Sequence, residues 1–338
     1  MRKNVEFNKR EIMIDFILPW VDGSDKNWQR KFSAYNNNLL ENDSRFTRYR
    51  DWDLLKYWFR GVECYAPWVN KIHFVTDDQI PDWLNIAHPK INIVDHKSYI
   101  PSEYLPTFSS HPIELNMHKI NGLSENFVLF NDDVFIIDDI DTEDFFKDGL
   151  PCDMAVQNAL TPGGIAKIIL NDIELIAKNF SKKEVLRKNM SKWFNLNYGK
   201  DLFRNVCLSP WPEFSSFYVP HLAQPFLKST LEKVWEAEYE VLHNTCKNKF
   251  RNNSDVNAYL FRFWHLCEGN FYPKSSKKLG AFHHMQDSSV DSICNIIKEK
   301  KHKIIAISDD EYLDFSLAKE KLKASFDLNF KGKSSYER

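Results

Sequence analysis

Short apolar runs that each end in polar side chains recur through the first 140 residues. The runs lie at 13–25, 70–78, 90–96 and 126–133, and their polar ends carry Asp22 and Asp25, Asp77 and Asp78, Asp95 and His96, and Asp132 and Asp133. Runs of this length with β-branched or aromatic residues are typical of buried strands. A helix is predicted within 48–65, where apolar residues recur at helical spacing: Leu54, Leu55, Trp58, Phe59 and Val62. This alternation predicts a parallel α/β sheet, which binds ligands beyond the carboxyl ends of its strands.

The fourth run is interrupted by Asn131, Asp132 and Asp133. The stretch reads FVLFNDDVFIIDDID, with apolar residues on both sides of the interruption. Two adjacent carboxylates at that depth repel each other and lose hydration, so something must compensate. The candidates are a divalent cation, basic side chains, or a turn that returns both groups to water. Asp309 and Asp310, after a late apolar run, repeat the arrangement.

The second half of the chain differs in composition and in predicted secondary structure. Residues 165–205 are rich in Lys and Asn with helical periodicity, and residues 221–268 are also predicted to be helical, with many aromatic side chains. We expect a polar loop at 274–289, a late strand within 300–312, a last helix and a frayed tail. The sequence thus predicts an α/β core at 1–155 and 300–338, with a helical insertion at 156–299 that carries part of the active site.

Composition narrows the class of protein. The chain has 338 residues, 43% of them hydrophobic, and a net charge of −2, which gives no global signature of nucleic-acid binding. No run approaches the ~18 apolar residues that span a bilayer, and the N-terminus lacks the apolar region of a secretory signal. Six scattered cysteines without a CxxC pair favour a reducing compartment over a zinc or disulfide scaffold. The Lys-rich segment 178–192 is either a solvated helix face or a contact for an anionic membrane or an acceptor.

The carboxylate pairs and the first turn suggest phosphate chemistry. Asp132 and Asp133 after a strand suit Mg²⁺ or Mn²⁺ held against a nucleotide diphosphate, because hard cations take oxygen ligands and keep several waters. The alternative is a solvated turn. Gly23 in WVDGSD permits a tight turn whose backbone N–H groups cradle a phosphate, although the same dipeptides are common in ordinary turns.

Other polar residues allow two interpretations each. Glu114 and His118 stand four residues apart, so they share a face if the segment is helical. His221 is either a structural residue or a group that exchanges a proton near neutral pH. Arg251 is either part of a surface ion pair or a ligand for an anion. Physics alone therefore predicts an α/β enzyme suited to a metal and a phosphorylated ligand, without naming the reaction.

Four blocks of the sequence, in order, resemble the Stealth family. They are IDFILPWVDGSDKNW at 14–28; the stretch 48–135, with VTDDQIPDWLN and LPTFSSHPIELN; the stretch 217–265, with VPHLAQP and FRNNSD; and KIIAISDDE at 303–311, followed by KSSYE. This family comprises bacterial capsular-polysaccharide sugar-1-phosphate transferases, to which the catalytic subunit of the animal N-acetylglucosamine-1-phosphotransferase is related. The resemblance implies a Rossmann-like, glycosyltransferase-A-like core with helical insertions.

The resemblance also implies a reaction. Hexose-1-phosphate, for example N-acetylhexosamine-1-phosphate, passes from a UDP-sugar to a hydroxyl of an oligosaccharide or lipid-linked glycan acceptor, and UMP leaves. The product is a phosphodiester of a capsular or other surface polysaccharide. Breaking a P–O bond in this way needs in-line attack and neutralisation of charge on the phosphate oxygens. We expect this work in the cytoplasm, with peripheral association at the inner face of the plasma membrane and no nucleic-acid partner.

The family positions that match this sequence assign roles as hypotheses. The catalytic set is Glu114, Asp133, His221 and Arg251. The metal ligands for Mg²⁺ or Mn²⁺ are Asp132, Asp133 and Asp309. The substrate-binding set is Trp20, Val21, Asp22, Gly23, Ser24, Asp25, Arg48, His118 and Asn131. In this scheme Arg251 binds the transferring phosphoryl group with both arms of its guanidinium, and His221 or Glu114 takes the acceptor proton.

Two departures from the family pattern and two rival functions stay open. VPHLAQP has a single His where the family has His-x-Pro-His, and Ser308-Asp309-Asp310 stands where an Asn-Asp pair is usual, which weakens Asp309 as a ligand. One rival is a conventional metal-dependent glycosyltransferase that uses the same donor. The other is a non-catalytic glycan-binding assembly protein.

Overall fold

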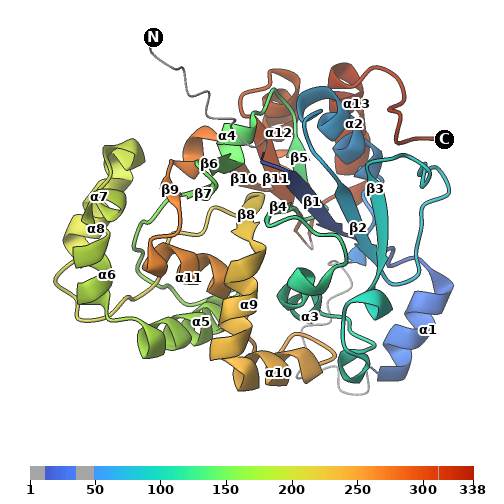
Figure 1. Ribbon diagram of the computed structural model, residues 1–338. Coiled ribbons are helices and arrows are strands. Elements are labelled where there is room, and N and C mark those ends of the chain that lie inside the picture. The colour runs from blue at the N-terminus through green and yellow to red at the C-terminus, as the bar shows by residue number, and fades with distance from the viewer. Residues whose placement is uncertain (1–11, 36–48, 311) are drawn as a thin grey trace, which may run out of the picture.

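A parallel sheet forms the centre of the molecule. The computed structural model describes residues 12–35, 49–310 and 312–338 (Figure 1). The main sheet has the order β3-β2-β1-β4-β8. Its parallel strands are β1 (Ile14–Pro19), β2 (Ile72–Thr76), β3 (Ile91–Asp95) and β4 (Asn126–Leu129), and β8 (Gln224–Leu227) runs antiparallel at the edge beside β4. The order β3-β2-β1-β4 is that of a Rossmann-like sheet, so the predicted α/β fold with mostly parallel strands is confirmed.

Two smaller sheets lie beside the main one. The first contains β10 (Gly280–His284), β11 (Ile304–Ser308) and β5 (Val134–Ile136), and the second contains β6 (Phe146–Lys147), β7 (Leu150–Asp153) and β9 (Tyr272–Pro273). The interrupted run at 127–141 is therefore two strands in two sheets, with Asp132 and Asp133 in the turn between β4 and β5. Of the three compensations that the sequence allowed, the turn is present, but it returns only Asp132 to solvent and leaves Asp133 half-buried.

Strands of the main sheet are buried on both faces, as expected for parallel strands. Phe16 and Phe74 point into one apolar cluster, while Ile17 and Val75 point into another. The first cluster includes α2 (Leu55–Tyr65), α12 (Val290–Lys298) and α13 (Phe315–Asn329). The apolar face predicted within 48–65 is buried in that cluster, which confirms the predicted helix and its orientation.

Helices from the second half of the chain pack against the other face of the main sheet. They include α5 (Ala166–Asn179), α9 (Lys228–Ala237), α10 (Tyr239–Lys247) and α11 (Tyr259–Glu268). Further out, α6 (Lys182–Lys188), α7 (Met190–Trp193) and α8 (Leu202–Leu208) lie together on the left in Figure 1. The remaining α-helices of the described part are α1 (Lys26–Tyr35), α3 (Ser110–Leu115) and α4 (Thr142–Phe145). Within that part, no helix is long and apolar enough to cross a bilayer.

Three local predictions were wrong. The expected polar loop at 274–289 contains β10, which pairs with β11 and in which only Gly280 is buried. The expected helical stretch 221–268 begins with β8, where Pro225 is tolerated because the strand lies at the sheet edge. The tail is docked: Tyr336 is buried, and both carboxylate oxygens of Glu337 accept hydrogen bonds from Arg60 at 2.7 and 2.8 Å.

Candidate active site

A cavity of about 750 Å³ lies beyond the carboxyl ends of the main-sheet strands. It is lined by residues that follow four of them: Trp20 and Val21 after β1, Asp77 after β2, His96 after β3, and Asn131, Asp132 and Asp133 after β4. The prediction that polar strand ends gather at one edge is confirmed. The α3 helix, the loop at 251 and the end of β11 complete the wall. This volume suits a ligand as large as a nucleotide sugar.

Carboxylates dominate one side of the cavity. Asp132 is open to the cavity, whereas Asp133 is half-buried and its enclosed Oδ1 has no hydrogen-bond partner among the described residues. The surrounding walls disfavour charge, and this desolvation raises the pKa of Asp132 to about 6 and that of Asp133 to about 7. The negative charge of Asp309 adds to both shifts. Asp309 also has a raised pKa, caused by burial and opposed by Arg50, whose Nε lies 3.5 Å from its Oδ2.

This acidic side fits a divalent cation that also binds a phosphorylated ligand. Within the described ranges, no group of three His, Cys, Asp or Glu side chains is placed to hold a metal by itself. Mg²⁺ needs only one or two carboxylates when phosphate oxygens supply further ligands. A cation would relieve both the unpartnered Oδ1 of Asp133 and the repulsion between the aspartates. Asp132 and Asp133 are the residues that would hold it. Asp309 lies near Arg50, but its enclosed Oδ2 also accepts no hydrogen bond among the described residues, so its role as a third ligand stays a prediction.

Glu114 and Arg251 face the same cavity from a different part of the chain. Glu114 lies on α3, a helix that begins where the Ser109 side chain accepts a hydrogen bond from the backbone N–H of His111. Burial raises the pKa of Glu114, and the positive charges of His111 and Arg251 oppose the rise. The guanidinium of Arg251 donates to the Ser110 hydroxyl at 3.0 Å. A carboxylate and a guanidinium therefore line the same cavity as the aspartates.

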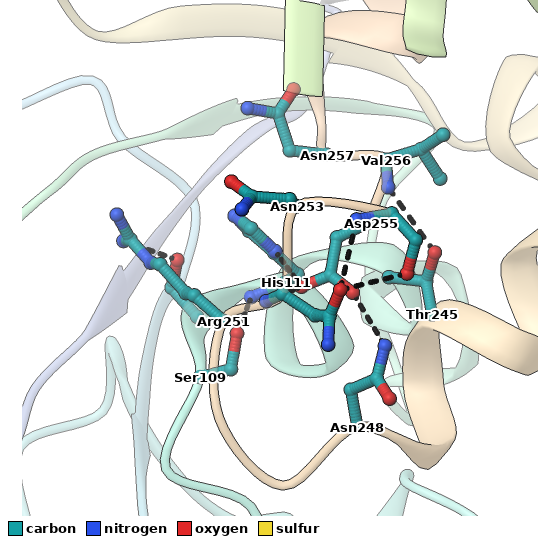
Figure 2. A network of polar contacts seen from close by, with 12 residues as sticks. Ser109, His111, Thr245, Asn248, Arg251, Asn253, Asp255, Val256 and Asn257 are labelled. Atoms are coloured by element: carbon teal, nitrogen blue, oxygen red, sulfur yellow. Dashed lines mark hydrogen bonds and ion pairs between the residues drawn. The ribbon is translucent and has the colours of Figure 1, made fainter. Parts of the chain in front are cut away.

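Asp255 holds the loop that carries Arg251 against the helix that carries Glu114. Figure 2 shows the Asp255 side chain at the centre of this network. Its fully buried carboxylate lies 2.8 Å from Nδ1 of His111 and accepts hydrogen bonds from the Asn248 side chain at 2.6 Å and the Asn252 backbone at 2.9 Å. His111 is itself buried and belongs to α3. This buried contact, together with the hydrogen bond from Arg251 to Ser110 and the backbone hydrogen bond from Phe108 to Lys249, therefore holds the two sequence-distant catalytic candidates near each other.

Replacing Asp255 by Asn is expected to loosen this arrangement. The amide has one acceptor oxygen for the three groups around it and leaves the His111 side chain poorly paired, so the free energy of unfolding should fall by about 3 kcal/mol. Urea denaturation followed by circular dichroism measures the loss. Ser254→Ala, at the exposed neighbouring position, is the control and should unfold like the wild type. Equal stability of the Asp255 variant and the wild type would contradict a structural role for this network.

Comparisons with known proteins place this chain in a family. The model described as Stealth protein CR2, conserved region 2, matches residues 48–152, and the one described as Stealth protein CR1, conserved region 1, matches residues 14–40. The chain is 42% identical over 330 residues to the capsular polysaccharide phosphotransferase WcwK of Streptococcus pneumoniae, with 96% of this chain and 98% of the relative covered. The chain belongs to the Stealth family. The resemblance to this family is confirmed, and the two family models match the regions of the first and second sequence blocks.

Other Stealth relatives match along nearly the whole chain. The exopolysaccharide phosphotransferase cps2G of Lactiplantibacillus plantarum is 40% identical over 345 residues, with 100% of both chains covered. The receptor polysaccharide phosphotransferase WefC of Streptococcus gordonii is 40% identical over 303 residues, with 88% of this chain and 90% of the relative covered. Among solved structures, the galactosyltransferase LgtC covers 95% of this chain and 98% of its own at 8% identity, but its TM-score of 0.41 is too low to bear on fold or function.

His221 of this Stealth protein is near the cavity without lining it. Its backbone has φ of 48°, and Nδ1 of its ring lies 3.3 Å from the Tyr259 hydroxyl. Burial raises the pKa of Tyr259, and the negative charges of Glu114 and Asp133 add to that rise. The His221 side chain is exposed to solvent, but the surrounding protein partly desolvates its ring, and this desolvation lowers its pKa. The cavity lining does not include His221, whose catalytic role stays a prediction.

Several predicted substrate-binding residues of the Stealth protein make local hydrogen bonds in the first turn. Asp22 accepts hydrogen bonds from the backbone N–H and hydroxyl of Ser24 at 2.8 and 2.6 Å, and Asp25 accepts one from the Trp28 backbone at 2.7 Å at the start of α1. Gly23 is required because a Cβ there would lie 2.2 Å from a backbone carbonyl oxygen. None of residues 22–25 lines the cavity. Their role as nucleotide ligands stays a prediction.

Two further predicted substrate-binding residues are not among the described residues that line the cavity. His118 is buried, with its ring 5.9 Å from that of Trp235, and burial lowers its pKa to about 4. Its role in substrate binding stays a prediction without geometric support. Arg48 lies outside the described residues.

The sequence interpretation missed several residues that line the Stealth cavity. Arg50 stands two positions after the predicted Arg48 in the same segment, RYRDWD, and approaches Asp309. His284 is the last residue of the unpredicted strand β10, with its Nε2 3.1 Å from Asp310 and its Nδ1 2.9 Å from the Ser308 hydroxyl. The two adjacent histidines in FHHMQD could have indicated a functional site. The segment was predicted to be a polar loop, so their position at the end of a strand was missed.

Proposed function

We propose that this Stealth protein transfers hexose-1-phosphate from a UDP-sugar to a hydroxyl group of a glycan acceptor. Relatives that match along nearly the whole chain are named as capsular, exopolysaccharide and receptor polysaccharide phosphotransferases, which supports the general activity. The observation that carries the proposal is the cavity itself. One cavity is lined by four side chains from distant parts of the sequence: Asp132, Asp133, Glu114 and Arg251. The identity of the sugar donor is the finer part of the proposal.

The proposed step is an in-line displacement at the sugar-proximal phosphorus. The acceptor hydroxyl oxygen forms a new bond to this phosphorus as the bond to the bridging oxygen breaks, and that oxygen leaves with UMP and the electron pair. The C1–O bond of the sugar stays intact. Arg251 would bind the equatorial phosphate oxygens through its planar fork, which stabilises charge in the transition state.

We assign the proton-accepting role to Glu114. Its carboxylate lines the cavity, whereas His221 does not, and its raised pKa makes it a stronger base than an ordinary glutamate. The positive charges of His111 and Arg251 limit this rise and so favour the ionised carboxylate that accepts a proton. His221, through its contact with Tyr259, would then orient groups of the site rather than take the proton.

Asp132 and Asp133 would hold Mg²⁺ or Mn²⁺ in this scheme. A bound divalent cation would supply positive charge to the diphosphate and so favour departure of UMP. Both aspartates line the cavity because they lie in the turn between β4 and β5. We propose that the reaction takes place in the cytoplasm, where UDP-sugars are made, on oligosaccharide or lipid-linked acceptors.

The identity of the released nucleotide tests the proposal. Purified protein with Mg²⁺, a panel of UDP-sugars and oligosaccharide acceptors should release UMP, detected by chromatography, and yield a product with a phosphodiester signal in the ³¹P NMR spectrum. Release of UDP with no phosphorus in the product would instead identify a conventional glycosyltransferase. Retained glycan binding with no turnover of any donor would identify an assembly protein. Acceptor-free reactions control for hydrolysis of the donor.

A further inference from the structure

An apolar surface faces solvent on α8 and on the turn that follows it. Phe203, Val206 and Cys207 stand at positions i, i+3 and i+4 of this helix and are all exposed, the first two by 69% and 53%. Trp211, just beyond the helix, is 59% exposed. We name these four residues the α8 surface. Large apolar groups that gather in this way on one helix face indicate a binding surface.

The protein holds the α8 surface rigidly. On the opposite side of the helix, the buried Asn205 side chain donates hydrogen bonds to two backbone carbonyls at 2.7 and 2.6 Å. The Lys182 ammonium group donates to the carbonyl oxygens of Leu208, Trp211 and Glu213 at 2.6, 2.9 and 3.3 Å. Prolines on both sides of Trp211 further restrict the turn. The exposed indole is therefore presented by a fixed backbone.

Positive charge surrounds this surface. Residues 181–213 contain seven Lys and Arg against three Asp and Glu, although the whole chain has a net charge of −2. Lys183 on α6 and Lys200 before α8 are exposed, and the carboxylate of Asp201 is buried beside Lys277 and Arg204. The charge that faces solvent in this region is thus mostly positive.

We propose that the α8 surface docks the protein onto an anionic lipid bilayer. Trp211 and Phe203 would enter the headgroup region, where aromatic side chains are favoured, and the lysines would bind lipid phosphates. A second copy of the chain is a poorer occupant, because a two-fold contact would bring two basic surfaces together. The inference does not rest on the proposed reaction. In Figure 1, α8 lies on the side of the molecule away from α1, whose Trp28 lines the cavity.

Vesicle binding by the full-length protein tests the proposal. Vesicles of phosphatidylcholine alone are compared with vesicles that contain about one-third phosphatidylglycerol, by co-sedimentation at increasing lipid concentration. The wild type should bind the anionic vesicles at least about tenfold more tightly. The double variant Phe203→Ser, Trp211→Ser should lose on the order of tenfold of that affinity. Lys183→Gln with Lys200→Gln should lose about fivefold for each charge removed.

Matched variants elsewhere on the surface serve as controls. Leu328→Ser removes an apolar side chain that is 61% exposed on α13, and Lys298→Gln with Lys331→Gln removes two exposed charges. These variants should bind vesicles like the wild type, and all variants should share its thermal unfolding midpoint. No binding to anionic vesicles, or the same binding by wild type and α8-surface variants, would overturn the proposal. It would equally fall if light scattering showed a dimer that the serine variants dissociate while vesicles stay unbound.

Discussion

Replacing Asp133 by Asn is expected to lower the turnover number about a thousandfold while making the ligand-free protein more stable. The carboxylate is the proposed cation ligand, so its loss removes charge stabilisation from the reaction. In the free protein, however, the same carboxylate is partly desolvated beside Asp132 and has a pKa of about 7. A neutral amide avoids that repulsion, and the free energy of unfolding at pH 8 should rise by about 2 kcal/mol.

The pH dependence of stability gives this prediction a definite sign. Well below pH ~4 the Asp133 carboxyl is protonated in both the folded and unfolded chains and contributes no penalty. As the pH rises toward 7, the unfolded chain loses this proton first, so the wild-type free energy of unfolding falls through that window and then levels off. The asparagine variant should lack most of this fall. Urea titrations of both proteins between pH 5 and pH 8 measure the difference.

A metal readout separates the proposed ligand role from simple repulsion. Millimolar Mg²⁺ with UDP should raise the melting temperature of the wild type and leave that of the Asp133→Asn variant unchanged, and EDTA should abolish the wild-type shift. Asp139→Asn, at an exposed position shortly after β5, is the matched control and should behave like the wild type in every assay. Unchanged turnover in the Asp133 variant would refute its catalytic role.

Replacing Arg251 by Lys is expected to lower the turnover number between a hundredfold and about a thousandfold. Lysine keeps the positive charge but has no planar fork, so it cannot bind two phosphate oxygens at once. Because charge beside Glu114 is kept, the acidic limb of the pH–rate profile should stay in place. Steady-state kinetics should show the loss mainly in kcat, since the contact strengthens as charge develops on the phosphoryl group.

Replacing the same residue by Ala should also move the pH profile. Without the guanidinium, the pKa of Glu114 rises further, because Arg251 is one of the charges that lower it. If Glu114 must be ionised to accept the proton, the acidic limb then shifts to higher pH. Arg187→Lys, at an exposed position of α6, is the control for the substitution itself. Superimposable profiles for the Lys and Ala variants would show that Glu114 is not the base.

Much of the fold and part of the candidate site were predictable because they depend on local pattern. A short, continuous apolar run indicates a parallel strand that is buried on both faces. The polar residues that follow such a run lie at the carboxyl-end edge of the sheet. Asp77, His96 and the Asn131–Asp133 turn all line the cavity for this reason. The turn at Gly23 was equally local. Its side chains proved to serve the turn and the start of α1, because short polar residues next to free backbone N–H groups bind those groups first.

Where the sequence by itself was insufficient, the partners were far apart along the chain. His111 and Asp255 are 144 positions apart, and no periodicity relates them, so only the packing of α3 against the loop after α10 reveals their contact. The edge strands β8 and β10 have weak patterns of their own and exist because β4 and β11 offer them hydrogen bonds. The sequence thus determined the family, the central sheet and the acidic edge. The tertiary structure decided which side chains reach the cavity and which polar groups are already satisfied, since burial and charge at one residue depend on neighbours that only folding brings together.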